Sequence, residues 1–219
     1  QAEGGGLKHP LNKAELPIIC TAGSSEAARE FAAKHADYYL MRAEKPEEIQ
    51  KLIADIRERA IRHGRTDIKF GLSIDTIARA TEEEAFAAAQ RFLDEAAEKQ
   101  RLNAGAAHKG FRSARVLSFE KEYQHKEGSK SVHDFFIHDN VWSGFGYIGI
   151  PPGVALVGSY TQIIQRIAEY QSIGVDLFFL AGYPHLEENY RLGEHVLPYF
   201  RGQREKLKRT TLVSTDEVA

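Results

Sequence analysis

The stretch PIICTAGSSEAAREFAAKHADYYL, residues 17–40, contains the pattern that decides the fold. An apolar run at 17–21 predicts a strand, an alanine-rich stretch at 24–35 predicts a helix, and a second apolar run at 37–41 predicts another strand. Two strands joined through a helix are typical of a parallel pair with a right-handed crossover. Between the first strand and the helix lies Gly23-Ser24-Ser25. This corner either caps the helix or also holds an anion such as a phosphate.

The same alternation continues along the chain. Further strands are predicted at residues 68–78 and 175–181, and further helices at 46–63, 81–101, 160–172 and 186–199. Four strand–helix units are half of an eight-stranded barrel, and an open half would leave two strand edges and an apolar inner face in water. Two architectures therefore stay open: a doubly wound sheet covered by helices on both faces, or a barrel completed by chain outside these residues.

The segments outside the strand–helix units differ from them in composition. We predict a connector at residues 1–16, an insertion at about 102–153 within the half-barrel of 17–201, and a polar tail at 202–219. The insertion is either a lid over the site or a solvated surface segment. The chain begins with Gln1 and its only methionine is Met41, so we interpret it as the later part of a longer protein.

Bulk composition excludes several classes of protein. Hydrophobic residues make up 42% of the 219 residues, enough for a core, and the formal net charge is -2. This charge gives no reason to expect nucleic acid or an anionic membrane surface as a partner. The apolar runs are too short to span a bilayer. The only cysteine, Cys20, cannot form an internal disulfide, which suits a cytoplasmic location; inside a buried strand we expect it to be inert.

Several motifs resemble one family. In chain order they are AGSSEAA (residues 22–28), NVWSGFGYIG (140–149), LVG (156–158), GVD (174–176) and AGYPHLEE (181–188). Together they resemble the flavin-dependent monooxygenases of the bacterial luciferase-like superfamily, and most closely the alkanesulfonate monooxygenase branch. Residues 102–139 match only loosely.

The resemblance implies an α/β fold, a TIM barrel to which this chain supplies roughly strands five to eight. It implies reduced FMN as cofactor, O2 as co-substrate, a small organic substrate, and a separate NAD(P)H:flavin reductase. It also implies a partner segment, the amino-terminal half of the barrel, and a homo-oligomer. It makes Gly23, Ser24 and Ser25 the candidate phosphate turn, which suits the N–H groups and partial positive charge of a helix amino terminus.

The strand at 68–78 departs from the sulfonate branch. Alternation places Gly71, Ser73, Asp75 and Ile77 on one face, and small polar groups late in a barrel strand line the site. The branch carries Arg and His where Ser73 and Asp75 stand here. Losing two cations and gaining a carboxylate is unfavourable for a sulfonate anion. We therefore expect a substrate that is not a simple alkanesulfonate and is neutral or cationic near Asp75. Asp75 can instead bond a backbone N–H at the strand end.

Tyr183 and His185 follow the last strand at the same end of the sheet. Tyr183 can donate a hydrogen bond to the substrate or to oxygen at the flavin, and together with Asp75 and Ser73 it completes our candidate catalytic set. Both residues have a structural alternative, in which Tyr183 packs under the loop and His185 orients the next helix. HDFFIHD, residues 133–139, has histidines whose spacing suits neither a helix face nor a strand face, so we predict no metal site.

Three functions follow from these patterns. The first is a reduced-FMN-dependent monooxygenase, in which the flavin does the chemistry, and the protein binds the flavin phosphate and excludes water from the site. The second is a deazaflavin-dependent enzyme that transfers hydride. The third is a non-catalytic half-barrel that binds flavin or a partner chain.

Overall fold

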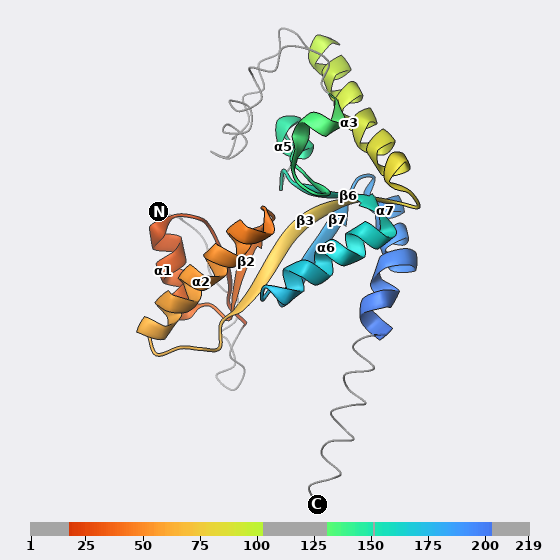
Figure 1. Cartoon of the computed structure of the whole chain (residues 1–219). Helices are drawn as coiled ribbons and strands as arrows, with labels where there is room; N and C mark the ends of the chain where they lie inside the picture. Colours follow the sequence, from red (N-terminus) through yellow and green to blue (C-terminus); the bar gives the residue numbers. More distant parts are fainter. Residues whose placement is uncertain (1–17, 103–130, 151, 203–219) are drawn as a thin grey trace, which may run out of the picture.

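Four parallel strands form the centre of the molecule in the computed structural model, which describes residues 18–102, 131–150 and 152–202 (Figure 1). They are β1 (Cys20–Ala22), β2 (Tyr38–Arg42), β3 (Lys69–Arg79) and β7 (Leu177–Gly182). β1 pairs with β2, β2 with β3, and β3 with β7, all in parallel. The four predicted strands are thus confirmed, with bounds shifted by one to three residues.

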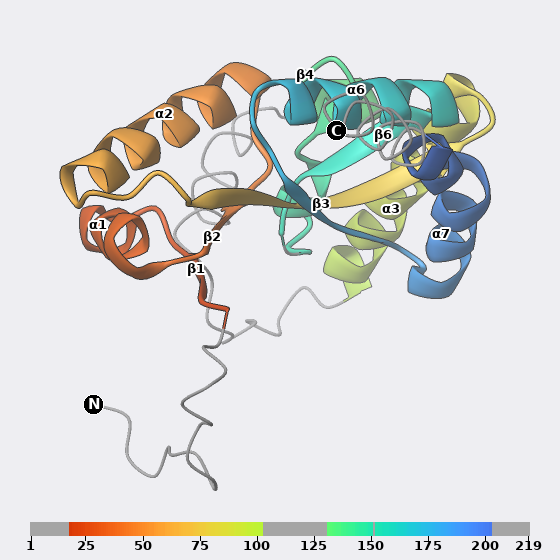
Figure 2. The same ribbon diagram turned by 90° about the horizontal axis from the view of Figure 1, so that it is seen from below.

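Four helices follow one another around the outer side of this arc (Figure 2). They are α1 (Glu26–His35), α2 (Pro46–Arg62), α6 (Tyr160–Ser172) and α7 (His185–Arg191), which continues through a π-helical turn at Leu192–Val196 to residue 202. Pro46 begins α2, because a missing N–H costs nothing in the first helical turn. Ser159 and Gln162 form a capping box at the start of α6. All four helices lie where the sequence predicts them.

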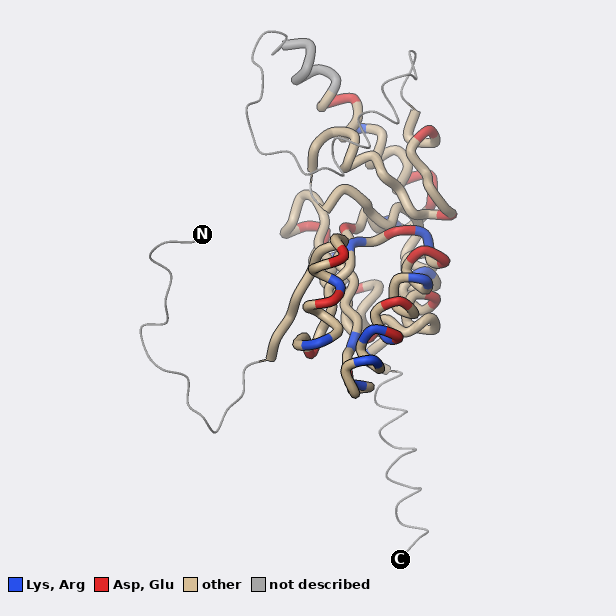
Figure 3. The backbone as a smooth tube through the Cα atoms, turned by 90° about the vertical axis from the view of Figure 1, so that its left-hand side faces the viewer, with Lys and Arg blue, Asp and Glu red and all other residues tan. Residues whose placement is uncertain are grey.

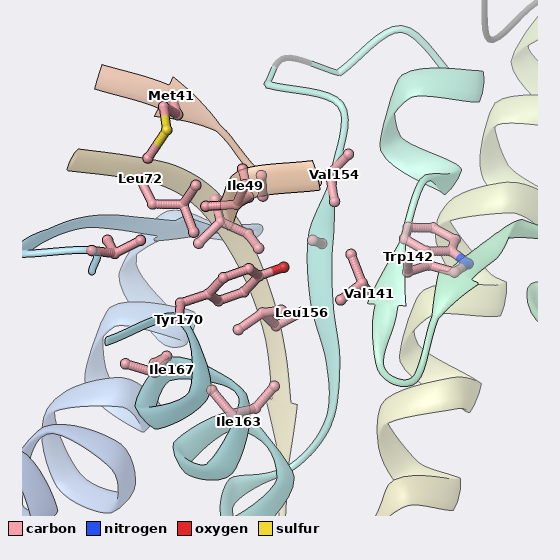
Figure 4. Close-up of a cluster of buried hydrophobic side chains, with 14 of the residues drawn as sticks. Met41, Ile49, Leu72, Val141, Trp142, Val154, Leu156, Ile163, Ile167 and Tyr170 are labelled. Carbon is pink, nitrogen blue, oxygen red and sulfur yellow. The ribbon is translucent and has the colours of Figure 1, made fainter. Parts of the chain in front are cut away.

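The core lies between the outer face of the strands and these helices. Tyr39 and Met41 of β2 and Phe70, Leu72 and Ile74 of β3 are buried there. From α6, the side chains of Ile163, Ile167 and Tyr170 point toward them (Figure 4). The Tyr170 hydroxyl also donates a hydrogen bond of 2.6 Å to the carbonyl oxygen of Glu44, which ties α6 to the loop before α2.

The helix α3 (Glu82–Leu102) lies where the sequence predicts a helix, but it does not take the barrel position after β3. In the barrel, α6 occupies the position between β3 and β7, whereas α3 packs mainly on β6 (Ala155–Ser159). β6 lies parallel to the last five residues of β3, beyond the end of β2, and the antiparallel hairpin of β4 (Phe136–His138) and β5 (Val141–Trp142) extends from it. A short 3-10 helix (Val132–Phe135) and α5 (Gly144–Tyr147) complete this layer.

The sequence predicted no regular elements between 102 and 158, and for the described part this was wrong. The strands there have two to five residues each, too few for a periodic pattern to emerge. Buried Trp142 anchors the layer by donating a hydrogen bond of 3.0 Å to the carbonyl of Val132. Residues 103–130 and 151, the predicted connector at 1–16 and the tail from 203 on lie outside the described residues.

The inner face of the arc and its two outer edges are open. Among the described residues, β1 pairs only with β2 and β7 only with β3. Phe179, on the inner face of β7, is 64% exposed. Cys20 is exposed too, so our expectation that it lies inside a buried strand was wrong. The reason is that β1 is an edge strand whose inner face nothing in the described chain covers.

This openness excludes a doubly wound sheet within the described residues, because that architecture has helices on both faces. The chain has an α/β fold with a curled half-barrel sheet. No described helix is long and apolar enough to cross a membrane.

Charges of both signs are interleaved on the side formed by α1 and α2, without a face of one sign (Figure 3). Arg59 of α2 joins the two helices through Glu26 at 2.5 Å and Glu30 at 3.1 Å. It also pairs with Asp55 at 2.9 Å on its own helix. Such a network fixes α1 on α2, although each exposed pair contributes little by itself.

Candidate functional site

The candidate residues lie at the carboxyl ends of the parallel strands. The register places Ala22 of β1 level with Leu40 of β2, Gly71 of β3 and Leu177 of β7. Asp75 is four residues farther along β3, which at roughly 3.3 Å per residue is about 13 Å beyond that level. β1 and β3 are two strand spacings apart, about 10 Å. The two parts of the site are therefore separated by the length of an elongated ligand.

The turn after β1 has the geometry of an anion-binding corner. Gly23 has φ +124°, and a Cβ there would come within 2.9 Å of the Ala28 Cβ. Ser25 is the N-cap of α1, and its hydroxyl accepts a hydrogen bond of 3.2 Å from the N–H of Ala28. The hydroxyl of Ser24 has no hydrogen-bond partner among the described residues. Of the two serines, Ser25 thus caps the helix and Ser24 is left available.

Two neighbours hold this turn in place. Tyr39, buried on β2, donates a hydrogen bond of 2.6 Å from its hydroxyl to the Gly23 carbonyl oxygen. Its burial raises the pKa of the Tyr39 phenol. Glu26, the first residue of α1, directs its carboxylate to Arg59 and Arg29. The negative charge beside the turn is therefore neutralised by α2 and by its own helix, so it does not oppose an anion.

Asp75 is a buried carboxyl on the inner face of β3. It is 2% exposed, and its Oδ2 has no hydrogen-bond partner among the described residues. Burial raises the pKa of Asp75 to about 7, against a smaller opposing effect of His185. The alternative role, bonding a backbone N–H at the strand end, is not seen, because no described residue donates a hydrogen bond to this carboxylate. A carboxyl that is both unpaired and titrating near neutrality is typical of a functional position.

Tyr183 and His185 are brought together with Asp75 by the β3–β7 pairing, because Asp75 is the partner of Ala181 in the register. The Tyr183 ring contacts the His185 ring, with centroids 4.5 Å apart, and meets the ring of Phe145 edge-on at 5.5 Å. Burial, and secondly the charge of Asp75, raise the pKa of the Tyr183 phenol. Tyr183 thus stays a neutral hydrogen-bond donor at physiological pH.

Ser73 lies on the same face, two residues before Asp75. Its neighbours in the register are Arg42 of β2 and Phe179 of β7, and its side chain is half-buried. Sequence reasoning missed Arg42, an exposed cation on the inner face, because β2 is short and its charged last residue resembles a strand end. It also missed Phe145, whose role depends on an insertion that had no recognisable pattern.

Glu188 is the other residue that the sequence did not reveal. It is completely buried in α7, where its Oε1 accepts a hydrogen bond of 2.5 Å from the N–H of Ala78 and its Oε2 pairs with Arg79 at 2.7 Å. A Cβ on Gly182 would come within 2.2 Å of the Glu188 Cγ. Glu188 therefore fixes α7, the end of β7 and the end of β3 around Asp75.

In the stretch 133–139, His133 and Asp134 make structural contacts. His133 packs against the rings of Phe86 and Phe136, and the Asp134 carboxylate caps the 3-10 helix through the N–H of Ser131. Within the described ranges, no group of three or more potential ligands could hold a metal ion.

Comparison with known proteins gives consistent results. The sequence model of the family described as luciferase-like monooxygenase matches residues 5–177. Among solved structures, the chain is similar to long-chain alkane monooxygenase LadA (24% identity, TM-score 0.55) and to DmoA from Hyphomicrobium sulfonivorans (21%, 0.59). It is also similar to the EDTA monooxygenase EmoA from Chelativorans sp. BNC1 (18%, 0.59).

These likenesses cover 85% to 91% of the chain but only 41% to 47% of the three neighbours. The chain thus spans less than half the length of the structures it matches. At these identities the likeness shows the fold, and it agrees with a half-barrel that leaves two strand edges open.

Proposed function

The chain belongs to the luciferase-like monooxygenase family, and on this premise we propose that it forms the phosphate-anchoring half of a reduced-FMN-dependent monooxygenase. Bound FMN would supply the electrons that activate O2, and one oxygen atom would be transferred to a small organic substrate. A separate NAD(P)H:flavin reductase would deliver the reduced flavin. One observation carries the proposal. At the carboxyl ends of the parallel strands, which form one rim of the sheet, lie both Ser24, free at a helix amino terminus, and Asp75, an unpaired buried carboxyl.

Gly23, Ser24 and α1 fit the phosphate of FMN. The amino terminus of a helix attracts an anion through its free N–H groups and its dipole. Gly23 allows close approach because it has no Cβ, and the Tyr39 hydrogen bond keeps its carbonyl turned away from the anion. Ser24 adds one hydroxyl donor. Asp75 then lies about 13 Å farther along the strands, and Tyr183 follows two residues after its register partner Ala181; the flavin ring and substrate would meet there.

Asp75, Tyr183 and Ser73 would act on the substrate. Tyr183 donates a hydrogen bond, and Asp75 can hold or release a proton near neutral pH because its pKa is about 7. The Phe145 ring covers Tyr183 and helps to exclude water. The carboxyl at Asp75 disfavours a sulfonate group beside it, so we propose a substrate that is neutral or cationic there and is not a simple alkanesulfonate.

The barrel would be completed by an amino-terminal half. Large exposed apolar side chains gather on the first and last strand–helix units of this chain: Ile18, Ile19, Phe31, Leu177, Phe179, Leu186, Tyr190 and Tyr199. Burying a Phe or Leu stabilises by roughly 1.5–3 kcal/mol, so these surfaces favour a partner segment that adds strands beside both β1 and β7. We also propose that the completed barrel forms a homo-oligomer, which would use surfaces other than these.

The phosphate turn can be tested with two adjacent serines. In the completed barrel, we expect Ser24→Ala to weaken FMN binding about ten- to hundredfold, since one hydrogen bond to a charged group is lost, without changing stability. Ser25→Ala should instead lower stability by about 1 kcal/mol through loss of the cap. Riboflavin, which lacks the phosphate, is the control ligand: equal weakening of riboflavin and FMN by Ser24→Ala would contradict the assignment.

The reaction is tested by O2 consumption with reduced FMN, followed by identification of an oxygenated product. Hydride transfer without O2 uptake would contradict oxygenation and support the deazaflavin-dependent enzyme. Flavin binding without turnover would support the non-catalytic half-barrel. Micromolar affinity for simple alkanesulfonates would overturn the proposed substrate class.

A further inference from the structure

A cavity away from Asp75 and the phosphate turn forms a groove that is lined by residues of α3, β4, the turn after β4, and α6. Its volume of about 720 Å³ is within the usual range of small-molecule sites. It has no lining residue in common with the phosphate turn or with the cluster of Asp75, Tyr183 and Phe145. The flavin reaction therefore gives this groove no role.

The groove has an excess of negative charge. Three carboxylates line it, Glu82, Asp139 and Glu169, whereas Arg166 is the only lysine or arginine among the described residues that line it. The Asp139 carboxylate has no partner among the described residues, and Glu82 accepts one hydrogen bond of 2.5 Å from the Gln162 amide. Carboxylate oxygens thus remain free to accept hydrogen bonds from a ligand.

Arg166 cannot serve an anion, because its guanidinium is already occupied. Its Nε donates to the Asn140 side chain at 2.9 Å, and its Nη2 donates to the backbone carbonyl of Asp139 at 3.0 Å. Its Nη1 pairs with Glu169. The side chain is buried, and these contacts fix it as part of the groove wall.

The groove also has an aromatic wall. The rings of Phe86 and Phe136 lie 5.2 Å apart, and both residues line the cavity. His138 lines it as well, and its Nδ1 is buried without a hydrogen-bond partner among the described residues. Aromatic faces beside carboxylates attract organic cations, since the ring quadrupole and the negative charges act together.

We propose that this groove binds a small organic cation, an amine with an aromatic or apolar body. Its ammonium group would lie among Asp139, Glu82 and Glu169, and its body would pack on Phe86 and Phe136. This inference does not depend on the proposed oxygenation, since the groove and the rim are lined by different residues.

The test uses 2-phenylethylammonium as the probe, with 3-phenylpropionate as an anion of similar size. Binding to the full chain is followed by saturation-transfer NMR and calorimetry, with no flavin present. We expect the ammonium probe to bind at least tenfold more tightly than the anion. Raising ionic strength from about 20 to 500 mM should weaken the ammonium probe several-fold, because the attraction is screened.

Two variants locate the binding. Asp139→Asn should weaken the ammonium probe about three- to tenfold through loss of one nearby charge, and Phe86→Leu about threefold through loss of a ring face. Glu58→Gln is the matched control, since Glu58 pairs with Arg62 on α2 away from the groove, and it should change nothing. Equal affinity for the anion, or no effect of Asp139→Asn and Phe86→Leu, would overturn the proposal. So would an absence of binding at about 10 mM probe.

Discussion

Removal of the Glu188 carboxylate is predicted to cost more stability than the loss of any exposed charge on α7. Glu188 has no solvent-exposed surface, and four groups surround it. Its Oε1 accepts from the Ala78 N–H and, at 3.4 Å, from the Thr76 hydroxyl. Its Oε2 meets Arg79 at 2.7 Å and Arg191 at 3.4 Å. All of these except Arg191 lie on the end of β3.

The magnitude follows from what Glu188→Ala leaves behind. Breaking a buried ion pair by removing one partner costs about 3–5 kcal/mol, because the remaining charge of Arg79 loses its counterion. The N–H of Ala78 also loses its acceptor, which is part of the same loss. We therefore expect the free energy of unfolding to fall by about 4 kcal/mol for Glu188→Ala. Glu188→Gln keeps one acceptor oxygen and should cost about half as much.

The assay is urea unfolding, followed by the fluorescence of buried Trp142, the only tryptophan, and by far-UV circular dichroism. Coincident transitions would establish two-state behaviour. With a slope of about 2 kcal/mol per molar urea, Glu188→Ala should shift the midpoint by about 2 M. The matched control is Glu187→Ala, an exposed neighbour that should change stability by less than about 0.5 kcal/mol. If Glu188→Ala lies within 1 kcal/mol of this control, Glu188 does not hold α7 on β3.

Two further predictions concern the rim. The pKa of Asp75 is about 7 in the folded state and near 3.9 in the unfolded state. Between these pH values the folded state therefore holds a proton that the unfolded state has lost. The free energy of unfolding should fall by at most about 4 kcal/mol as pH rises from about 4 to about 8. Asp75→Asn should remove this part of the pH dependence, and an unchanged profile in urea titrations would refute the assignment. Gly23→Ala should destabilise by about 1–3 kcal/mol, since Gly23 has φ +124° and no space for a Cβ. Gly193→Ala, in a helical turn with open space around it, should stabilise by up to about 1 kcal/mol, as thermal unfolding of both variants would show.

The strand–helix units could be predicted because each carries its own local signals. The apolar runs are long enough to identify strands, and Ser25 and Pro46 mark helix starts with contacts that stay within one turn. Alternation alone could place Asp75 on the inner face of β3, opposite to Leu72 and Ile74, which are buried in the core. Its orphaned oxygen and its raised pKa could not be predicted, because they depend on side chains from other elements.

Glu188 shows where sequence reasoning ends. A glutamate in the first turn of a helix favours a solvated position that complements the helix dipole, and this describes Glu187. Glu188 is buried only because Gly182, six residues earlier, leaves space for its side chain against the end of β3. The contact between Glu188 and the end of β3 joins residues more than one hundred positions apart, so no local pattern could have indicated it.

The distribution of exposed apolar side chains carries the argument for completion of the barrel. Among the described residues of the interior units of the arc, from β2 through α6, Ile61 is the only large apolar side chain that is exposed. The units at both ends, β1 with α1 and β7 with α7 and its continuation, expose eight, from Ile18 to Tyr199. If the arc stayed open, the apolar side chains at both ends would remain exposed to water, which is unfavourable. Added strands would bury them and pair the free edges of β1 and β7. Since eight parallel strands close a barrel, we propose that the segment that satisfies both edges supplies four.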